Sequence, residues 1–102
     1  MNRGEIWLAE AGRKTRPVLV LTRSDVIGVR QLVTVAEVTT SIRGISVEVA
    51  LDSASAGLNE MSVVNCDGLH TIKRSSLTQR IGAVGDATMT EVCEAVGSAM
   101  GC

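Results

Sequence analysis

Hydrophobic and polar residues alternate over much of the chain, and this alternation predicts β-strands. The most regular case is the segment 45–51, where apolar side chains at every second position share one face. A buried strand is predicted at 17–22, because residues 18–21 are apolar throughout and half of them are β-branched. The same criteria place further strands at residues 5–9, 30–39, 61–65, 68–72 and 79–84.

The segments between these strands are rich in Gly, Ser, Thr and Asp, which favour turns. Ser24 and Asp25 are expected to open a short helical turn that ends near Gly28. The remaining connections are predicted to be turns or loops at residues 10–15, 41–44, 52–58 and 75–78.

The final segment has a different period. Its apolar residues recur at intervals of three and four, as on one face of a helix: Met89, Val92, Cys93, Val96 and Met100. Asp86 or Thr88 is expected to cap the start, and Thr88 with Glu91 has the form of a capping box. Short antiparallel strands followed by one helix predict a single α+β domain over residues 1–102, with a small sheet curled into a partly open barrel.

Composition and charge limit the possible partners. Apolar residues make up 45% of the chain, but Trp7 is its one aromatic residue, so there is no aromatic surface on which bases could stack. The net charge is −1. All ten basic residues lie between Arg3 and Arg80, and three of the eleven acidic residues lie beyond them. Any contact with nucleic acid is therefore expected to be local.

Cys66, Cys93 and Cys102 are odd in number and widely spaced. They resemble no metal site, so we expect reduced thiols in a cytoplasmic protein without a bound metal or cofactor. Arg3 and Glu5 interrupt any apolar leader, and no stretch approaches the roughly 18 apolar residues of a membrane span. No membrane partner is expected.

The strongest functional signal is Arg16, which Pro17 joins to the apolar run at 18–21. Proline cannot donate a hydrogen bond within a sheet, so Pro17 is expected at the first residue or the edge of a strand. Arg16 is then held at the mouth of that strand, with its guanidinium outside the core. Arginine stays charged at neutral pH, and its planar fork matches phosphate oxygens.

These residues and others resemble the MazF/PemK family of toxin ribonucleases. The resemblance extends over the whole chain. It is carried by RGEIW at 3–7, RPVLVL at 16–21, VTVAEVTT at 33–40, Thr71 with Ile72, and Leu77, Ile81 and Gly82 before the capped helix.

The resemblance implies a CcdB/PemK-type barrel, similar in shape to SH3 barrels, that acts as a homodimer. It implies metal-independent cleavage of single-stranded RNA at short sequence motifs. It also implies a cognate antitoxin whose disordered tail occupies the RNA groove. Catalytic roles carry over to Arg16 and Thr39, with Thr40 as an alternative to Thr39.

Two loops depart from the family pattern, and both are expected to touch RNA or a partner. The loop at 10–15, with Arg13 and Lys14, is shorter than in many members. Asp67 and His70 stand where several members have an acid followed by Gln and a basic residue. These four residues and Arg43 are candidates for RNA binding or auxiliary roles.

RNA carries its own nucleophile, the 2′-hydroxyl, so the enzyme needs to align it, take its proton and neutralise the phosphate. The expected products are a 2′,3′-cyclic phosphate and a 5′-hydroxyl. A fixed donor such as Arg16 is typically worth about 2.7–4 kcal/mol towards the barrier. Arg16 is a poor base, and His70 is the one side chain naturally suited to proton transfer near neutral pH.

Two other functions remain open. The same barrel can serve as a non-nucleolytic toxin that binds a protein such as DNA gyrase, as CcdB does. The chain, however, ends in Ala99, Met100, Gly101 and Cys102, without the hydrophobic helix end that CcdB inserts into its target. The other alternative is a catalytically silent module that binds RNA or an antitoxin.

Overall fold

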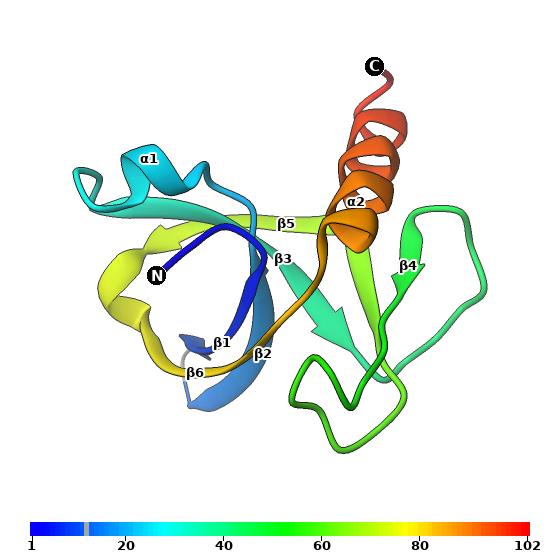
Figure 1. The fold of residues 1–102 in the computed structure, drawn as a ribbon, viewed down its shortest axis with the longest axis horizontal. Coiled ribbons are helices and arrows are strands. Elements are labelled where there is room, and N and C mark those ends of the chain that lie inside the picture. The colour runs from blue at the N-terminus through cyan, green and yellow to red at the C-terminus, as the bar shows by residue number, and fades with distance from the viewer. Residues whose placement is uncertain (12) are drawn as a thin grey trace.

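The computed structural model describes residues 1–11 and 13–102, and it consists of one antiparallel sheet and a C-terminal helix (Figure 1). The strands are β1 (Glu5–Ala11), β2 (Lys14–Val20), β3 (Leu32–Thr39), β4 (Glu48–Ala50), β5 (Val63–Lys73) and β6 (Leu77–Ala83). The helical segments are α1 (Ser24–Ile27), the 3₁₀ turn η1 (Arg74–Ser76) and α2 (Asp86–Ala99).

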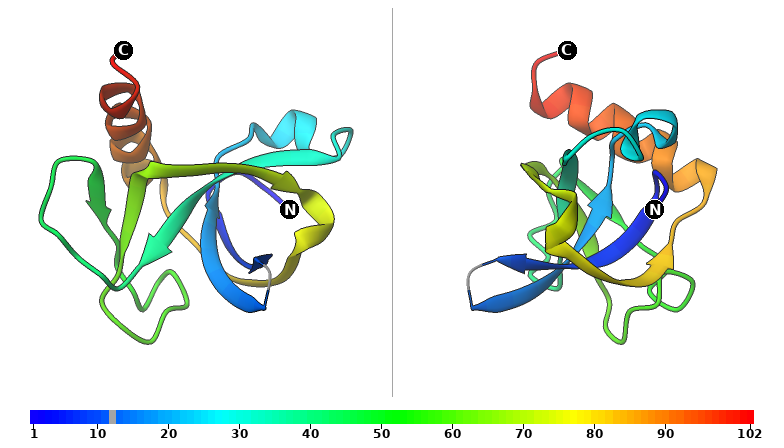
Figure 2. Two further views of the ribbon diagram at one scale, coloured as in Figure 1. Left: turned by 180° about the vertical axis from the view of Figure 1, so that it is seen from behind. Right: turned by 90° about the vertical axis from the view of Figure 1, so that its left-hand side faces the viewer.

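The sheet has the strand order β4-β5-β3-β2-β1-β6, and every neighbouring pair is antiparallel. Figure 1 looks along the interior of the curled sheet, and Figure 2 shows α2 standing at one end of it. α2 packs against β4 and β5. The predicted fold class, an α+β domain with a curled, partly open sheet and a C-terminal helix, is confirmed.

The loop between β4 and β5 crosses to β6, the strand at the far end of the sheet order. A Cβ atom on Gly57 would lie 1.8 Å from the carbonyl oxygen of Ile81, and one on Gly82 would lie 1.9 Å from that of Ala56. Gly57 also has a φ of +76°, a conformation that glycine adopts readily. The two glycines thus allow the backbone of the β4–β5 loop to contact the backbone of β6 directly, next to the open edge of the curled sheet.

Opposite faces of the strands pack into two apolar clusters. Leu19 of β2 and Val64 of β5 belong to the first cluster, together with Val92 of α2. Val18 and Val20 point the other way, into a second cluster inside the curl. The half-buried Trp7 packs against this second cluster, as expected for a core residue.

Pro17 lies in the middle of β2, and the prediction that it begins the strand is wrong. Pairing with β1 extends from Leu19 back to Lys14, and Pro17 lies opposite Leu8. Pairing with β3, however, starts only at Val18. Pro17 therefore stands where the β3-facing edge of β2 has no partner, so its missing N–H leaves no gap in the sheet.

The most regular alternation in the sequence yields the shortest strand. Residues 45–51 were expected to be extended, but β4 covers three of them and Ile45 is exposed. The reason lies in the partner strand, because β5 pairs with β4 only from Val63 to Asn65.

A single long β5 replaces the two strands expected at 61–65 and 68–72. Its register against β3 jumps from Leu69 opposite Ala36 to Asn65 opposite Glu37, so residues 66–68 form a bulge. The polar and small residues that suggested a break are thus accommodated without ending the strand.

The C-terminal helix begins earlier than its capping pattern indicates. Gly85 is the N-cap and makes no side-chain capping bond, so the expected cap by Asp86 or Thr88 is absent. Thr88 lies inside the first turn of α2. Of the predicted apolar face, Val92 is fully buried, whereas Cys93 and Met100 are exposed. The helix is therefore held in place by packing against β4 and β5, and not by a side-chain cap.

Cys66, Cys93 and Cys102 are free cysteines, as expected. Burial raises the pKa of the Cys66 thiol. Within residues 1–11 and 13–102, no helix is long and apolar enough to cross a membrane.

Candidate active site

Arg16 stands on β2 between two cavities. The first, of about 250 Å³, has a floor of Ala9, Val18, Val35 and Ile72 and a rim of Glu10, Arg16, Glu37 and His70. The second, of about 380 Å³, brings Arg16 together with Thr39 and Thr40 at the end of β3 and with residues of the loop before β5. Arg16 is exposed, and no ion pair reaches it among the described residues.

Thr39 and Arg16 line the same cavity. Arg16 lies on β2 and Thr39 at the end of β3, and both contribute to the wall of the second cavity. The paired part of β2 and β3 begins just before these positions, at Val18 and Glu37. The sequence brought these two residues together only through the family resemblance, and their catalytic roles remain predictions.

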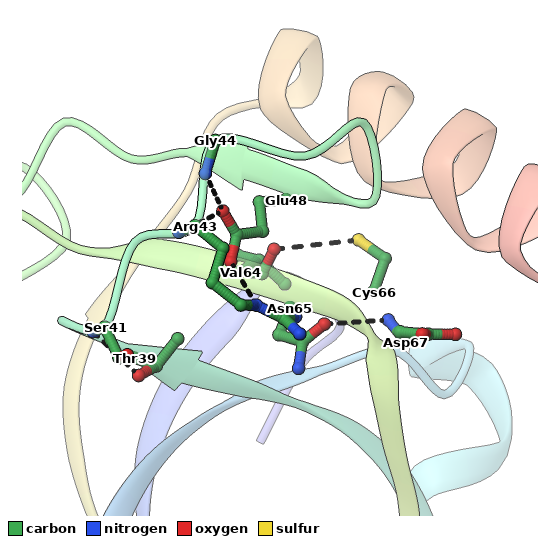
Figure 3. A network of polar contacts seen from close by, with 9 residues as sticks. All are labelled: Thr39, Ser41, Arg43, Gly44, Glu48, Val64, Asn65, Cys66 and Asp67. Atoms are coloured by element: carbon green, nitrogen blue, oxygen red, sulfur yellow. Dashed lines mark hydrogen bonds and ion pairs between the residues drawn. The ribbon is translucent and has the colours of Figure 1, made fainter.

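The hydroxyl of Thr39 remains able to donate a hydrogen bond. Its Oγ1 accepts a bond of 3.0 Å from the amide of Ser41, a contact visible in Figure 3. A hydroxyl that accepts one bond still has its own hydrogen to offer. Thr39 is half-buried, whereas Thr40 is exposed. The cavity beside Arg16 therefore contains a permanent cation and a held hydroxyl, two donors suited to phosphate oxygens.

His70 and Glu37 meet on the rim of the first cavity. His70 lies on β5 opposite Val35, and its Nε2 is 3.2 Å from Oε2 of Glu37. The histidine side chain is 54% exposed and the glutamate side chain 44% exposed. Both groups are thus accessible from the cavity that Arg16 also lines.

Arg43 has a different place from the one expected of an RNA-binding residue. Its Nε lies 3.2 Å from Oε2 of Glu48, and its amide donates to the same carboxylate. The amide of Gly44 donates as well, so the carboxylate fastens the loop before β4 (Figure 3). Burial alone would raise the pKa of Glu48, but hydrogen bonds from Arg43, Gly44 and Ile45 lower the pKa below its ordinary value.

The other candidates lie on the surface around the cavities. Arg13 and Lys14 are exposed at the β1–β2 hairpin, and their neighbour at position 12 lies outside the described residues. Asp67 is exposed in the β5 bulge, where its amide donates to Oδ1 of Asn65 (Figure 3). None of these three lines either cavity, and their roles remain predictions.

Sequence reasoning overlooked Glu37. Its signal was present in the alternation of β3, where Val33 and Val35 point to the core and Glu37 takes the next position on the same face. A charged residue that continues an apolar face marks the place where the core opens to a cavity. Gly68 was overlooked too, because its contact with Glu37 depends on the unpredicted bulge.

Comparison with known families agrees with this geometry. Residues 2–100 match the family described as PemK-like, MazF-like toxin of type II toxin–antitoxin system. The chain belongs to this PemK/MazF family. The match covers nearly all of the chain.

Curated relatives in the PemK/MazF family come from Mycobacterium tuberculosis. The chain is 38% identical over 103 residues to "Probable endoribonuclease MazF5", with 98% of this chain and 93% of the relative covered. It is 43% identical over 86 residues to "Endoribonuclease MazF3", with 84% and 82% covered.

Solved structures of PemK/MazF proteins have the same fold. The Mycobacterium tuberculosis toxin MazF-mt6 superposes with a TM-score of 0.89 at 40% identity, covering 95% of this chain and 96% of that one. An endoribonuclease in complex with its cognate antitoxin, from a mycobacterial species, also gives 0.89 at 26% identity, covering 99% and 95%.

Proposed function

We propose that this chain is an endoribonuclease toxin that cleaves single-stranded RNA at a phosphate held by Arg16. The observation that carries the proposal is the position of Arg16, which is exposed between two cavities and lines one of them together with Thr39. Family membership and relatives named as endoribonucleases support it.

The residues suit cleavage by the RNA's own 2′-hydroxyl. The guanidinium of Arg16 neutralises the charge that develops on the phosphate oxygens, and the hydroxyl of Thr39 donates a second hydrogen bond to them. The 2′-oxygen then attacks phosphorus, the bond to the 5′-oxygen breaks, and the products are a 2′,3′-cyclic phosphate and a 5′-hydroxyl. The chain's own side chains supply each of these contacts.

Cleavage of a defined pool of single-stranded RNA in EDTA tests this function. The wild-type chain should cut at short motifs and leave cyclic phosphate ends. Arg16→Ala should lower the rate about 10²–10³-fold, the usual cost of removing one donor aimed at developing charge. Its thermal melting should stay close to wild type, because Arg16 is exposed. Full activity in Arg16→Ala would remove the arginine from the mechanism.

We also propose an antitoxin partner and a homodimer. A related endoribonuclease has been solved with its cognate antitoxin, and an extended segment of such a partner would cover the cavities beside Arg16. For the dimer, the support is the family resemblance together with exposed apolar side chains such as Met61, which is 76% exposed. Light scattering after gel filtration distinguishes a dimer from a monomer. A monomeric mass at micromolar concentration would contradict the dimer.

A further inference from the structure

We propose that Glu37 is a positioning residue that orients His70 as the base of RNA cleavage, an inference that rests on the function proposed above. The contact between Oε2 of Glu37 and Nε2 of His70, at 3.2 Å, lies on the rim of the cavity that Arg16 also lines. In many enzymes the residue that accepts the proton is oriented by a hydrogen bond to a further side chain.

The reaction requires a group that takes a proton, and Arg16 is unsuited to that task because guanidinium does not deprotonate near neutral pH. Thr39 is equally unsuited, since a neutral hydroxyl is a weak base. His70 is the one histidine of the chain, and imidazole changes its charge near neutrality. It lines the same cavity as Arg16, so both side chains can reach a phosphodiester bound there.

The contact with Glu37 also determines which ring nitrogen of His70 can accept a proton from the RNA. An ionised carboxylate can only accept hydrogen bonds, so Nε2 of His70 carries the proton that Glu37 accepts. Nδ1 of the neutral ring then has its lone pair free. The ring is more than half exposed, which leaves Nδ1 open to substrate in the cavity.

Gly68 makes room for this arrangement. A Cβ atom at position 68 would lie 2.2 Å from Oε2 of Glu37 and 3.0 Å from its Cδ. The φ of Gly68 lies outside the left-handed region, so the backbone itself does not demand glycine here. The bulge at 66–68 thus brings a residue without a side chain against the carboxylate that orients His70.

The proton transfer balances with the bonds that change. The 2′-hydroxyl gives its proton to Nδ1 of His70 as the O2′–P bond forms. The P–O5′ bond breaks, and the 5′-oxygen takes a proton from water. His70 returns its proton to water, and Glu37 stays ionised throughout.

Other charged groups line the same cavity as His70. They are Glu10 from β1 and Arg16 from β2, in addition to Glu37 from β3. Glu10 provides a matched comparison, because Glu10→Gln removes the same charge from the same cavity. No hydrogen bond joins Glu10 to His70 among the described residues.

The experiment measures kcat, KM and the pH–rate profile on a single-stranded RNA that the wild-type chain cuts. We expect His70→Ala to lower kcat about 10²–10⁴-fold, the usual contribution of a general base, and added imidazole to restore part of it. Glu37→Gln should lower kcat by part of that factor, with KM little changed. Glu10→Gln removes a charge from the same cavity but no contact with His70, so its kcat should lie nearer to that of wild type.

Gly68→Ala tests the geometry without changing any charge. The added methyl meets the flexible end of Glu37, so it should push the carboxylate away from His70 and lower kcat as Glu37→Gln does. Gly28→Ala is the matched control, because a Cβ there meets nothing within 4 Å and the residue is the C-cap of α1, outside both cavities beside Arg16. Its kcat should equal that of wild type. Thermal melting of each variant verifies that it is folded.

The outcomes separate the two proposals. If wild type cuts and Arg16→Ala does not, but Glu37→Gln and Gly68→Ala match Gly28→Ala in kcat and pH profile, the role of Glu37 is wrong and the nuclease function stands. If folded wild-type protein cuts no single-stranded RNA, both proposals are overturned. A loss of kcat in Glu10→Gln as large as that in Glu37→Gln would also contradict the orienting role.

Discussion

Two carboxylates on either side of β5 have similar kinds of partner but different surroundings. Glu37 on β3 and Glu48 on β4 both lie opposite Asn65 of β5. Glu48 has a side chain that is 3% exposed, an arginine as ion-pair partner and a glycine amide as donor. Glu37 has a side chain that is 44% exposed, a histidine as partner and a glycine pressed against it. The first is surrounded by donors that belong to its own loop, whereas the second faces a cavity.

The comparison shows how to distinguish a structural acid from a functional one. Glu48 accepts hydrogen bonds from residues close to it in the sequence, and these bonds hold the loop before β4 in place. Glu37 has one side-chain partner among the described residues, and that partner can itself exchange protons. A carboxylate beside a cavity that can still accept hydrogen bonds is able to contact a substrate or a catalytic residue.

The largest expected effect concerns two glycines, Gly57 in the loop after β4 and Gly68 beside Glu37. Gly57→Ala should destabilise the fold severely, because the new Cβ would meet the backbone of Ile81 at 1.8 Å. The positive φ alone costs on the order of 1–3 kcal/mol for a non-glycine residue. Gly68→Ala meets only side-chain atoms and should melt near wild type. Thermal melts of the two variants compare them directly, and equal melting temperatures would contradict the distinction.

A smaller effect is expected from removing each charge. Glu48→Gln should lower the melting temperature, because the amide cannot accept from Arg43 and Gly44 as the carboxylate does. Glu37→Gln should change the free energy of unfolding by less than about 0.5 kcal/mol, as is usual for exposed positions. Melting curves measured at pH 7 show both effects. A larger loss in Glu37→Gln than in Glu48→Gln would reverse the assignment of roles.

The smallest effect is the dependence of stability on pH. Burial favours the protonated form of Glu5, but bonds from Trp7, Asn2 and Arg80 lower its pKa, and Glu48 has a lowered pKa as well. A carboxylate with a lower pKa in the folded state stabilises the fold above its ordinary value of 4.5. That stabilisation is lost as pH falls through the lowered pKa.

Melting temperatures from pH 7 to pH 3 check this dependence. Wild type should lose stability below about pH 4.5, and Glu48→Gln should lose less over the same range. A flat wild-type curve would show that these acids do not differ between the folded and unfolded chains.

The parts of the fold that could be predicted from sequence are those that local patterns determine. The apolar run in β2, the alternation in β3 and the period of α2 each placed an element correctly. The errors arose where a distant partner decides the outcome. β4 is short because its ladder with β5 covers only residues 63–65, and Pro17 is tolerated because β3 begins to pair one residue later.

The site residues divide in the same way into those that a local sequence signal reveals and those whose role depends on a distant strand. Arg16 was found because its neighbours form a local motif, and His70 because it is the one histidine. Glu37 was overlooked because its meaning depends on β5, which is far away in the sequence. Arg43 was grouped with RNA-binding candidates because nothing local shows that Glu48 holds it.

The most direct measurement of the central claim maps where RNA binds. The wild-type chain, labelled with ¹⁵N, is titrated with a single-stranded RNA whose 2′-oxygens are methylated so that it cannot be cut. The account predicts the largest shifts at the Arg16 guanidinium, the His70 ring and the Thr39 amide, with small shifts at Gly44 beside Glu48. Large shifts at Gly44 and none at Arg16 or His70 would contradict it.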